Sequence, residues 1–162
     1  MPLAPLSRLP TGVLTIMKEV VRHVIRRPVV GICAVARSSD GRVLLVRRGD
    51  TGTWALPGGT LEWGEELRDA LPRELAEEAG AETLAIGGVT GIYSRPDRDP
   101  RFHAVTICVR VDVSATLSGP KNRLEILEAK FFQLDSAPHE LAMGMRDMLE
   151  HALRDDTEVV LE

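Results

Sequence analysis

The chain has 162 residues, 44% hydrophobic and 27% charged, which is typical of one soluble globular domain with a sizeable core. Its formal net charge of −4 argues against nucleic-acid binding, which normally needs a basic face. No apolar run approaches the roughly 20 residues that span a bilayer, and the N-terminus lacks a secretory pattern. We therefore expect a cytoplasmic protein, with Cys33 and Cys108 as core residues rather than a disulfide.

Residues 1–28 predict an extension outside the main domain, in which residues 13–27 form an amphipathic helix that Pro28 ends. Its apolar stripe consists of Val13, Ile16, Met17, Val20, Val21, Val24 and Ile25. The basic opposite face also fits a membrane surface, but the stripe has no Trp or Phe anchor. We therefore expect no membrane contact. The stripe should pack on this domain or on a partner subunit, and of these we favour a homodimer contact.

The rest of the chain mixes strand and helix patterns. Strands are predicted at 29–37, 42–48, 54–56, 83–93, 102–113 and 128–134, and helices at 65–79 and 137–153. The first two strands read as a hairpin, 114–124 as a polar loop, and the acidic residues 155–162 as a tail or edge segment. This order predicts one α+β domain at 29–154, a mixed sheet with helices on its faces.

The predicted helix at 65–79 has three glutamates on one side. Glu74, Glu77 and Glu78 stand at i, i+3 and i+4, within about a third of the helix circumference. Like charges at this spacing repel by a few tenths of a kcal/mol per pair, roughly, in an isolated helix. A hard divalent cation such as Mg²⁺ removes that penalty, so the pattern indicates a metal site.

One residue conflicts with this helix. Pro72 cannot donate to the carbonyl of Arg68, and an interior proline costs about 3 kcal/mol and usually kinks a helix. The geometry of the first half of the helix is therefore open. The three glutamates follow Pro72, so we expect their spacing to survive.

These residues resemble the signature of Nudix hydrolases, G-x5-E-x7-R-E-U-x-E-E-x-G-U, in which U is bulky and aliphatic. The matching positions are Gly59, Glu65, Arg73, Glu74, Leu75, Glu77, Glu78 and Gly80. The last U is Ala81, which is smaller than usual, and residues 54–59 (WALPGG) resemble the family's lead-in. The resemblance covers about 29–153 and implies a Nudix-type α/β/α sandwich around a mixed sheet, with the N-terminal helix as an addition.

The resemblance also implies roles for these residues. Glu74 and Glu78 are expected as the main ligands of Mg²⁺ or Mn²⁺, with Glu77 sharing a second ion or holding water and the carbonyl of Gly59 completing the set. Arg73 is expected to pin Glu77, and Glu65 to order the loop and Arg73. A divalent ion would neutralise the diphosphate, orient it and acidify a bound water.

The general base is expected outside the signature. Glu125 lies where relatives carry such an acid, and we favour it as base or as an extra metal ligand. Glu128 is the competitor, and either residue is also compatible with a surface charge beside a strand.

The segment from Tyr93 to Arg101 resembles that of small ADP-ribose pyrophosphatases and nucleoside diphosphate sugar hydrolases. These carry a proline sixteen residues after the signature, as Pro96 stands sixteen beyond Gly80 (96 − 80). We expect substrate contacts from Arg98 first and Arg95 second, with Arg101 and Tyr93 as further candidates, since arginine can clamp a diphosphate bidentately. Phe102 replaces a residue that is commonly small, which predicts a bulkier pocket wall.

The expected function is thus Mg²⁺-dependent hydrolysis of ADP-ribose or a nucleoside diphosphate sugar to a nucleoside monophosphate and a sugar phosphate. The partner is a small molecule linked to a nucleoside diphosphate. The alternatives are a house-cleaning nucleoside triphosphate pyrophosphohydrolase and a regulator that binds ADP-ribose without turnover. The complete signature and the lack of a helix-turn-helix domain disfavour the regulator. The preferred base and sugar, the phosphorus attacked and the number of metals stay open.

Overall fold

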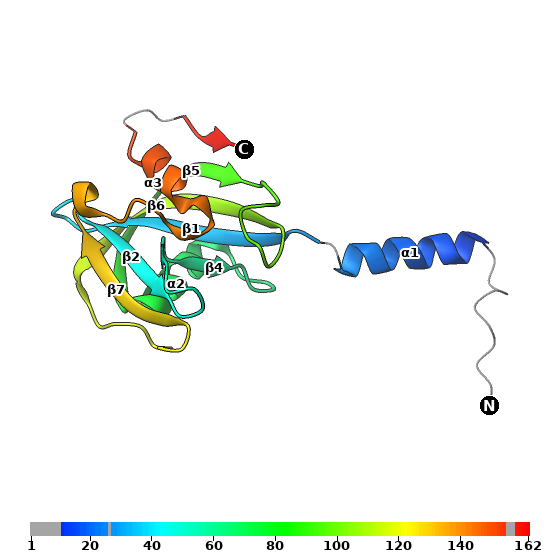
Figure 1. Cartoon of the computed structure of the whole chain (residues 1–162), viewed down its shortest axis with the longest axis horizontal. Coiled ribbons are helices and arrows are strands. Elements are labelled where there is room, and N and C mark those ends of the chain that lie inside the picture. Colours follow the sequence, from blue (N-terminus) through cyan, green and yellow to red (C-terminus); the bar gives the residue numbers. More distant parts are fainter. Residues whose placement is uncertain (1–10, 26, 155–157) are drawn as a thin grey trace.

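The structure is a computed structural model that describes residues 11–25, 27–154 and 158–162 (Figure 1). Its helices are α1 (Thr11–Ile25), α2 (Leu67–Glu78) and α3 (Met145–Ala152), with short 3-10 turns η2 (Leu134–Ser136) and η3 (Ala142–Gly144). Its strands are β1 (Val29–Arg37), β2 (Val43–Arg48), β3 (Trp54–Ala55), β4 (Gly58–Thr60), β5 (Ala81–Tyr93), β6 (Ala104–Leu117), β7 (Ile126–Phe132) and β8 (Val160–Leu161).

The strands form one mixed sheet in the order β3-β2-β1-β6-β5-β8, with β4 added to β1 and β7 to β2. The central strand β1 runs parallel to β6 over its whole length, and β5 runs antiparallel to β6. Residues 31–36 of β1 are all buried, as expected for a strand that is covered on both faces. The predicted hairpin is only partly right, because β1 and β2 pair at Arg37 and Val43 alone and β2 then pairs with β7.

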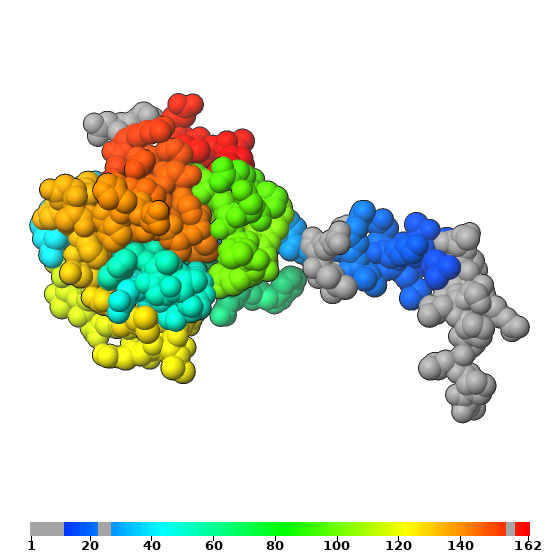
Figure 2. Space-filling view, viewed as in Figure 1, coloured from blue at the N-terminus to red at the C-terminus, as the bar shows by residue number. Residues whose placement is uncertain are grey.

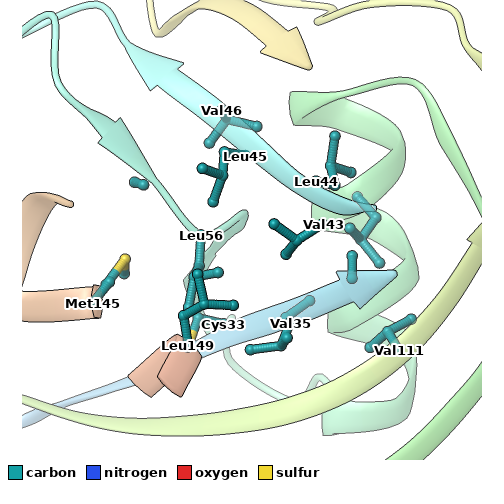
Figure 3. Close-up of a cluster of buried hydrophobic side chains, with 14 of the residues drawn as sticks. Cys33, Val35, Val43, Leu44, Leu45, Val46, Leu56, Val111, Met145 and Leu149 are labelled. Atoms are coloured by element: carbon teal, nitrogen blue, oxygen red, sulfur yellow. The ribbon is translucent and has the colours of Figure 1, made fainter. Parts of the chain in front are cut away.

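Helices cover the sheet, as the predicted sandwich requires. Helix α2 packs on β1 and β5, and α3 packs on β5 and β6. Figure 3 shows part of the resulting core, to which β1, β2 and α3 contribute buried side chains such as Cys33, Leu45 and Leu149. The α+β fold class predicted from the sequence is therefore confirmed.

Two predicted segments differ from the structure. The helix expected at 137–153 is divided, because Met143 and Gly144 adopt left-handed φ values of 56° and 65° and a right-handed helix cannot pass through them. Strand β6 continues to Leu117, into the expected polar loop. Within the acidic end, β8 is an edge strand that pairs in parallel with Gly91 and Ile92 of β5, while residues 155–157 lie outside the described residues.

Helix α1 extends away from the domain (Figures 1 and 2). Five residues of its stripe are open to solvent, with exposures between 40% and 65%: Val13, Ile16, Met17, Val20 and Val21. The expectation that this stripe packs on its own domain is therefore wrong for the described residues, whereas a contact with a partner subunit stays a prediction. Across the described residues, no helix is both long and apolar enough to cross a bilayer.

Candidate active site

Helix α2 carries the three signature glutamates and begins at Leu67, two residues later than predicted. It runs unbroken through Pro72 to Glu78, so the expected spacing of the glutamates is kept. Glu65 therefore precedes the helix, where its carboxylate accepts the backbone N–H of Glu62 at 3.1 Å. Gly80 follows the helix with a φ of 61°, and a Cβ there would lie 2.1 Å from Ser118 Oγ.

Arg73 ties the loop before α2 to the helix itself. Its Nε and Nη2 donate to the two carboxylate oxygens of Glu65 at 2.6 and 2.9 Å, a bidentate pair. Its Nη1 donates to Glu74 at 3.0 Å and to Glu77 at a longer 3.4 Å. Arg73 therefore holds Glu65 more closely than Glu77, and its hydrogen bond lowers the pKa of Glu65.

Glu74 lies directly against Gly59 of β4. A Cβ at position 59 would come within 2.3 Å of Glu74 Oε1, so only glycine leaves the carboxylate where it is. Burial raises the pKa of Glu74 against the opposing effect of Arg73, and the charges of Glu77 and Glu125 raise it further. Gly59 and Glu74, which are both predicted to give oxygen ligands to the metal ion, are thus neighbours.

Glu78 is the carboxyl group least suited to carrying an unpaired charge. Its Oε2 accepts the backbone N–H of Gly58 at 2.8 Å. Burial raises its pKa to about 8; the hydrogen bond from Gly58 and the charge of Arg48 oppose this rise, and the charges of Glu74 and Glu125 add to it. A divalent cation beside it would favour the charged form.

Glu125 reaches the same place from the loop before β7. Its backbone carbonyl accepts the N–H of Gly49 at 2.6 Å, and a Cβ at Gly49 would lie 2.1 Å from the carbonyl oxygen of Leu124. Glu128 instead faces Arg47 on β2, with Nε and Oε2 3.7 Å apart. The structure thus brings Glu125, and not its competitor, to the signature glutamates.

Two adjoining cavities contain these residues. The first, of about 410 Å³, is lined by Arg73, Glu74, Glu77, Glu78 and Glu125, with Thr60, Glu62, Lys121, Asn122 and Ile126. The second, of about 390 Å³, shares Glu78 and Glu125 with the first and extends to Arg48, Arg101, Phe102, Met143 and Met145. A carboxylate-lined cavity thus opens into one with arginine and apolar walls.

The carboxylates fit a hard divalent cation in chemistry and charge, because carboxylate and carbonyl oxygens suit Mg²⁺ or Mn²⁺. Their present orientation does not yet form a site. Glu74 is turned to Arg73 and Glu78 to the N–H of Gly58, and among the described residues no three His, Cys, Asp or Glu side chains are placed to hold a metal ion. Binding would therefore require carboxylate side chains to reorient within the cavity.

Of the residues predicted to contact the substrate, some line the second cavity and others do not. Arg101 lines the second cavity, is held by Asp99 at 2.8 Å and stacks on Phe102 with its Cζ 5.0 Å from the ring centroid. Arg95 is exposed and pairs with Asp97 at 3.3 Å. Phe102 lines the cavity, where a bulky wall was expected.

Tyr93 and Arg98 lie away from both cavity linings. Tyr93 is 1% exposed, and its hydroxyl is 2.9 Å from His151 Nδ1, so it is a core residue. The side chain of Arg98 is 7% exposed and paired with Asp147 and Glu162. The substrate contacts expected of these two residues do not fit this geometry, because their polar atoms already have protein partners. Sequence reasoning missed Arg48 and Met143, for which only the folded arrangement gives a signal.

Comparison with known proteins places this geometry in a family. A family model described as the NUDIX domain matches residues 26–152. An ADP-ribose pyrophosphatase of Methanocaldococcus jannaschii is 36% identical over 119 residues, which are 71% of this chain and 68% of that protein. An RNA pyrophosphohydrolase of Pseudomonas putida is 36% identical over 88 residues, 51% of this chain and 54% of that protein.

Solved structures agree. The crystal structure of a MutT NUDIX hydrolase from Burkholderia pseudomallei superposes with a TM-score of 0.67 at 28% identity, covering 78% of this chain and 98% of that one. The matched region contains the whole sheet except β8, together with α2 and α3. The chain therefore belongs to the Nudix hydrolase family, as the signature around α2 predicts.

Proposed function

We propose that the protein hydrolyses the pyrophosphate bond of ADP-ribose or a nucleoside diphosphate sugar, with Mg²⁺ or Mn²⁺, to a nucleoside monophosphate and a sugar phosphate. The observation that carries this proposal is the cavity shared by Glu74, Glu77, Glu78 and Glu125 and its opening toward Arg101. The similarity to an archaeal ADP-ribose pyrophosphatase supports the choice of substrate.

In this proposal Glu74, Glu77, Glu78 and the carbonyl of Gly59 hold the divalent ion. When bound, the ion supplies neutralisation of the diphosphate and a more acidic water. Arg73, which is fixed by Glu65, holds Glu74 in place. Glu125, which shares the cavity with Glu78, accepts the proton of the attacking water as one P–O bond forms and the bridging P–O bond breaks.

The second cavity receives the two ends of the substrate. Arg101 offers a guanidinium for phosphate or ribose oxygens, since its pairs with Asp99 leave the side chain about half exposed at 49%. Phe102, Met143 and Met145 provide apolar walls for a base or for the flat face of a sugar. A cavity of this size is within the range of about 300–1,000 Å³ that small-molecule sites occupy.

The alternative is a nucleoside triphosphate pyrophosphohydrolase, because the same glutamates and base would serve that reaction. A regulator without turnover is less well supported, since every charged position of the signature is present and the four glutamates share one cavity. Turnover of ADP-ribose, UDP-glucose and GDP-mannose with Mg²⁺ can be followed through phosphate released by a coupling phosphatase. Turnover of dNTPs can be followed through phosphate released from pyrophosphate by inorganic pyrophosphatase, and the comparison separates these functions. A preference for dNTPs would replace the proposal with the alternative.

A matched pair of variants tests the base. Glu125→Gln should lower kcat by about 10²–10⁴-fold, the usual contribution of a general base. Glu128→Gln makes the same chemical change three positions along the chain, beside Arg47 and outside the cavities, and should retain activity. Equal losses in the two variants would contradict the assignment of Glu125.

A further inference from the structure

Arg98 has every N–H group engaged within the protein. Its Nε donates to Glu162 at 2.8 Å, and its Nη2 to Asp147 at 2.7 Å and to the second oxygen of Glu162. Its Nη1 donates to Asp147 at 3.2 Å and to the carbonyls of Gly144 and Met143 at 3.1 and 3.4 Å. A guanidinium has five N–H donors, so none is left for a phosphate.

The groups around Arg98 come from segments far apart in the sequence. Arg98 itself is in the loop between β5 and β6, which also supplies Arg101 and Phe102 to the second cavity. Residues 143–147 supply Met143 and Met145 to the lining of the same cavity. Glu162 closes the arrangement from the C-terminal end, where its backbone N–H donates to Ile92 and its carboxylate accepts the N–H of Arg95 at 3.1 Å.

One of these segments needs such support. Met143 has a φ of 56°, a left-handed backbone conformation that is unfavourable for residues other than glycine. Such a conformation persists only where the surrounding structure holds it. Arg98 binds the carbonyls of both left-handed residues, Met143 and Gly144. The guanidinium of Arg98 also lies over the ring of Tyr93, with its Cζ 5.0 Å from the ring centroid. The hydroxyl of Tyr93 is in turn hydrogen-bonded to His151 of α3.

We propose that Arg98 is a positioning residue that joins the Arg101 loop to the Met143 segment, with Glu162, the residue after β8, completing the junction, so that these two parts of the lining of the second cavity keep their spacing. This inference rests on the proposed function for its effect on catalysis. It gives Arg98 no contact with the substrate. Substrate affinity then depends on Glu162, a residue that lines neither cavity.

Kinetics with ADP-ribose and Mg²⁺ provide the first test. Glu162→Gln and Arg98→Gln should each raise KM by about tenfold, equivalent to about 1.4 kcal/mol, with kcat within about twofold of the wild type. The double variant should be no worse than Arg98→Gln alone, because both changes break one junction. Arg146→Gln is the control, since it breaks an ion pair with Glu150 on the same helix α3 away from the cavities.

Two kinetic outcomes would overturn the inference. A direct substrate contact by Arg98 would raise KM in Arg98→Gln and leave it unchanged in Glu162→Gln. A purely structural role would lower Tm in both variants and leave KM at the wild-type value.

Hydrogen exchange of the free protein tests the junction without any substrate, and so separates its failure from failure of the proposed function. The amide of Arg101 donates to Asp99 at 2.9 Å, and that of Met145 donates to the carbonyl of Ala142. Both should exchange about tenfold faster in Glu162→Gln and Arg98→Gln, and at the wild-type rate in Arg146→Gln. Unchanged exchange at Arg101 and Met145 in the first two variants would overturn the inference, whether or not ADP-ribose is hydrolysed.

Discussion

Replacing Glu78 by glutamine should separate the stability of the protein from its activity. Glutamine has the same shape, and its Oε1 can accept the N–H of Gly58 as Glu78 does at 2.8 Å. The change removes the charge and with it a metal ligand. If that ligand contributes about 3–4 kcal/mol to the transition state, kcat falls by about 10²–10³-fold.

Stability should respond in the opposite direction in metal-free protein. The pKa of Glu78 is about 8 in the folded state against an ordinary value of 4.5, so the unfolded chain loses this proton first as pH rises. The carboxyl therefore destabilises the metal-free fold progressively between about pH 4.5 and pH 8. Glu78→Gln removes that loss and should show a higher Tm than the wild type at pH 8 in EDTA, with little difference at pH 4.5.

The assays are steady-state turnover at saturating Mg²⁺ and thermal unfolding at the two pH values. Glu66→Gln is the matched control, since Glu66 is an exposed residue at the start of the same helix and its side chain makes no capping hydrogen bond. Turnover of Glu78→Gln within about threefold of the wild type would refute the metal assignment. A Tm of Glu78→Gln below that of the wild type at pH 8 in EDTA would refute the claim that burial of the charged Glu78 destabilises the metal-free fold.

Three further predictions follow from other contacts. Gly59→Ala should displace the Glu74 carboxylate, 2.3 Å from the new Cβ, and so lower kcat while Tm changes little; a wild-type kcat would contradict the neighbourhood of Gly59 and Glu74. Light scattering should find a dimer for the full chain and a monomer without residues 1–27, whereas a dimer after truncation would exclude α1 as the essential contact. The pKa of Glu162 is lowered to about 2 by Arg98, so its stabilisation is present above about pH 4.5 and lost as pH falls toward 2. Acid unfolding should thus show the difference between wild type and Glu162→Gln shrinking over that range, and a constant difference would contradict the pairing.

Much of this site can be read from the sequence, because its residues are close along the chain. The glutamates of α2 lie within five residues of one another, and the helical repeat alone places them on one side. Gly59 and Glu65 belong to the same local signature. Pro72 obscures only the start of the helix, which the structure places at Leu67.

The surroundings of Arg98 could not be read in this way. Its partners Asp147 and Glu162 lie 49 and 64 positions away, and nothing local distinguishes Arg98 from Arg95 or Arg101. The break at Met143 is equally hidden, since a left-handed methionine has no pattern in the sequence. For α1, the apolar stripe predicts a helix but does not identify the surface that covers it.

The most direct test of the central claim is chromatography of the products that the wild-type protein forms from ADP-ribose, with Mg²⁺ and with EDTA. We expect AMP and ribose 5-phosphate in equal amounts with Mg²⁺, no turnover in EDTA, and recovery on adding Mn²⁺. Equal turnover in EDTA, or binding of ADP-ribose without any product in Mg²⁺ or Mn²⁺, would contradict a metal-dependent hydrolase built on the glutamates of α2.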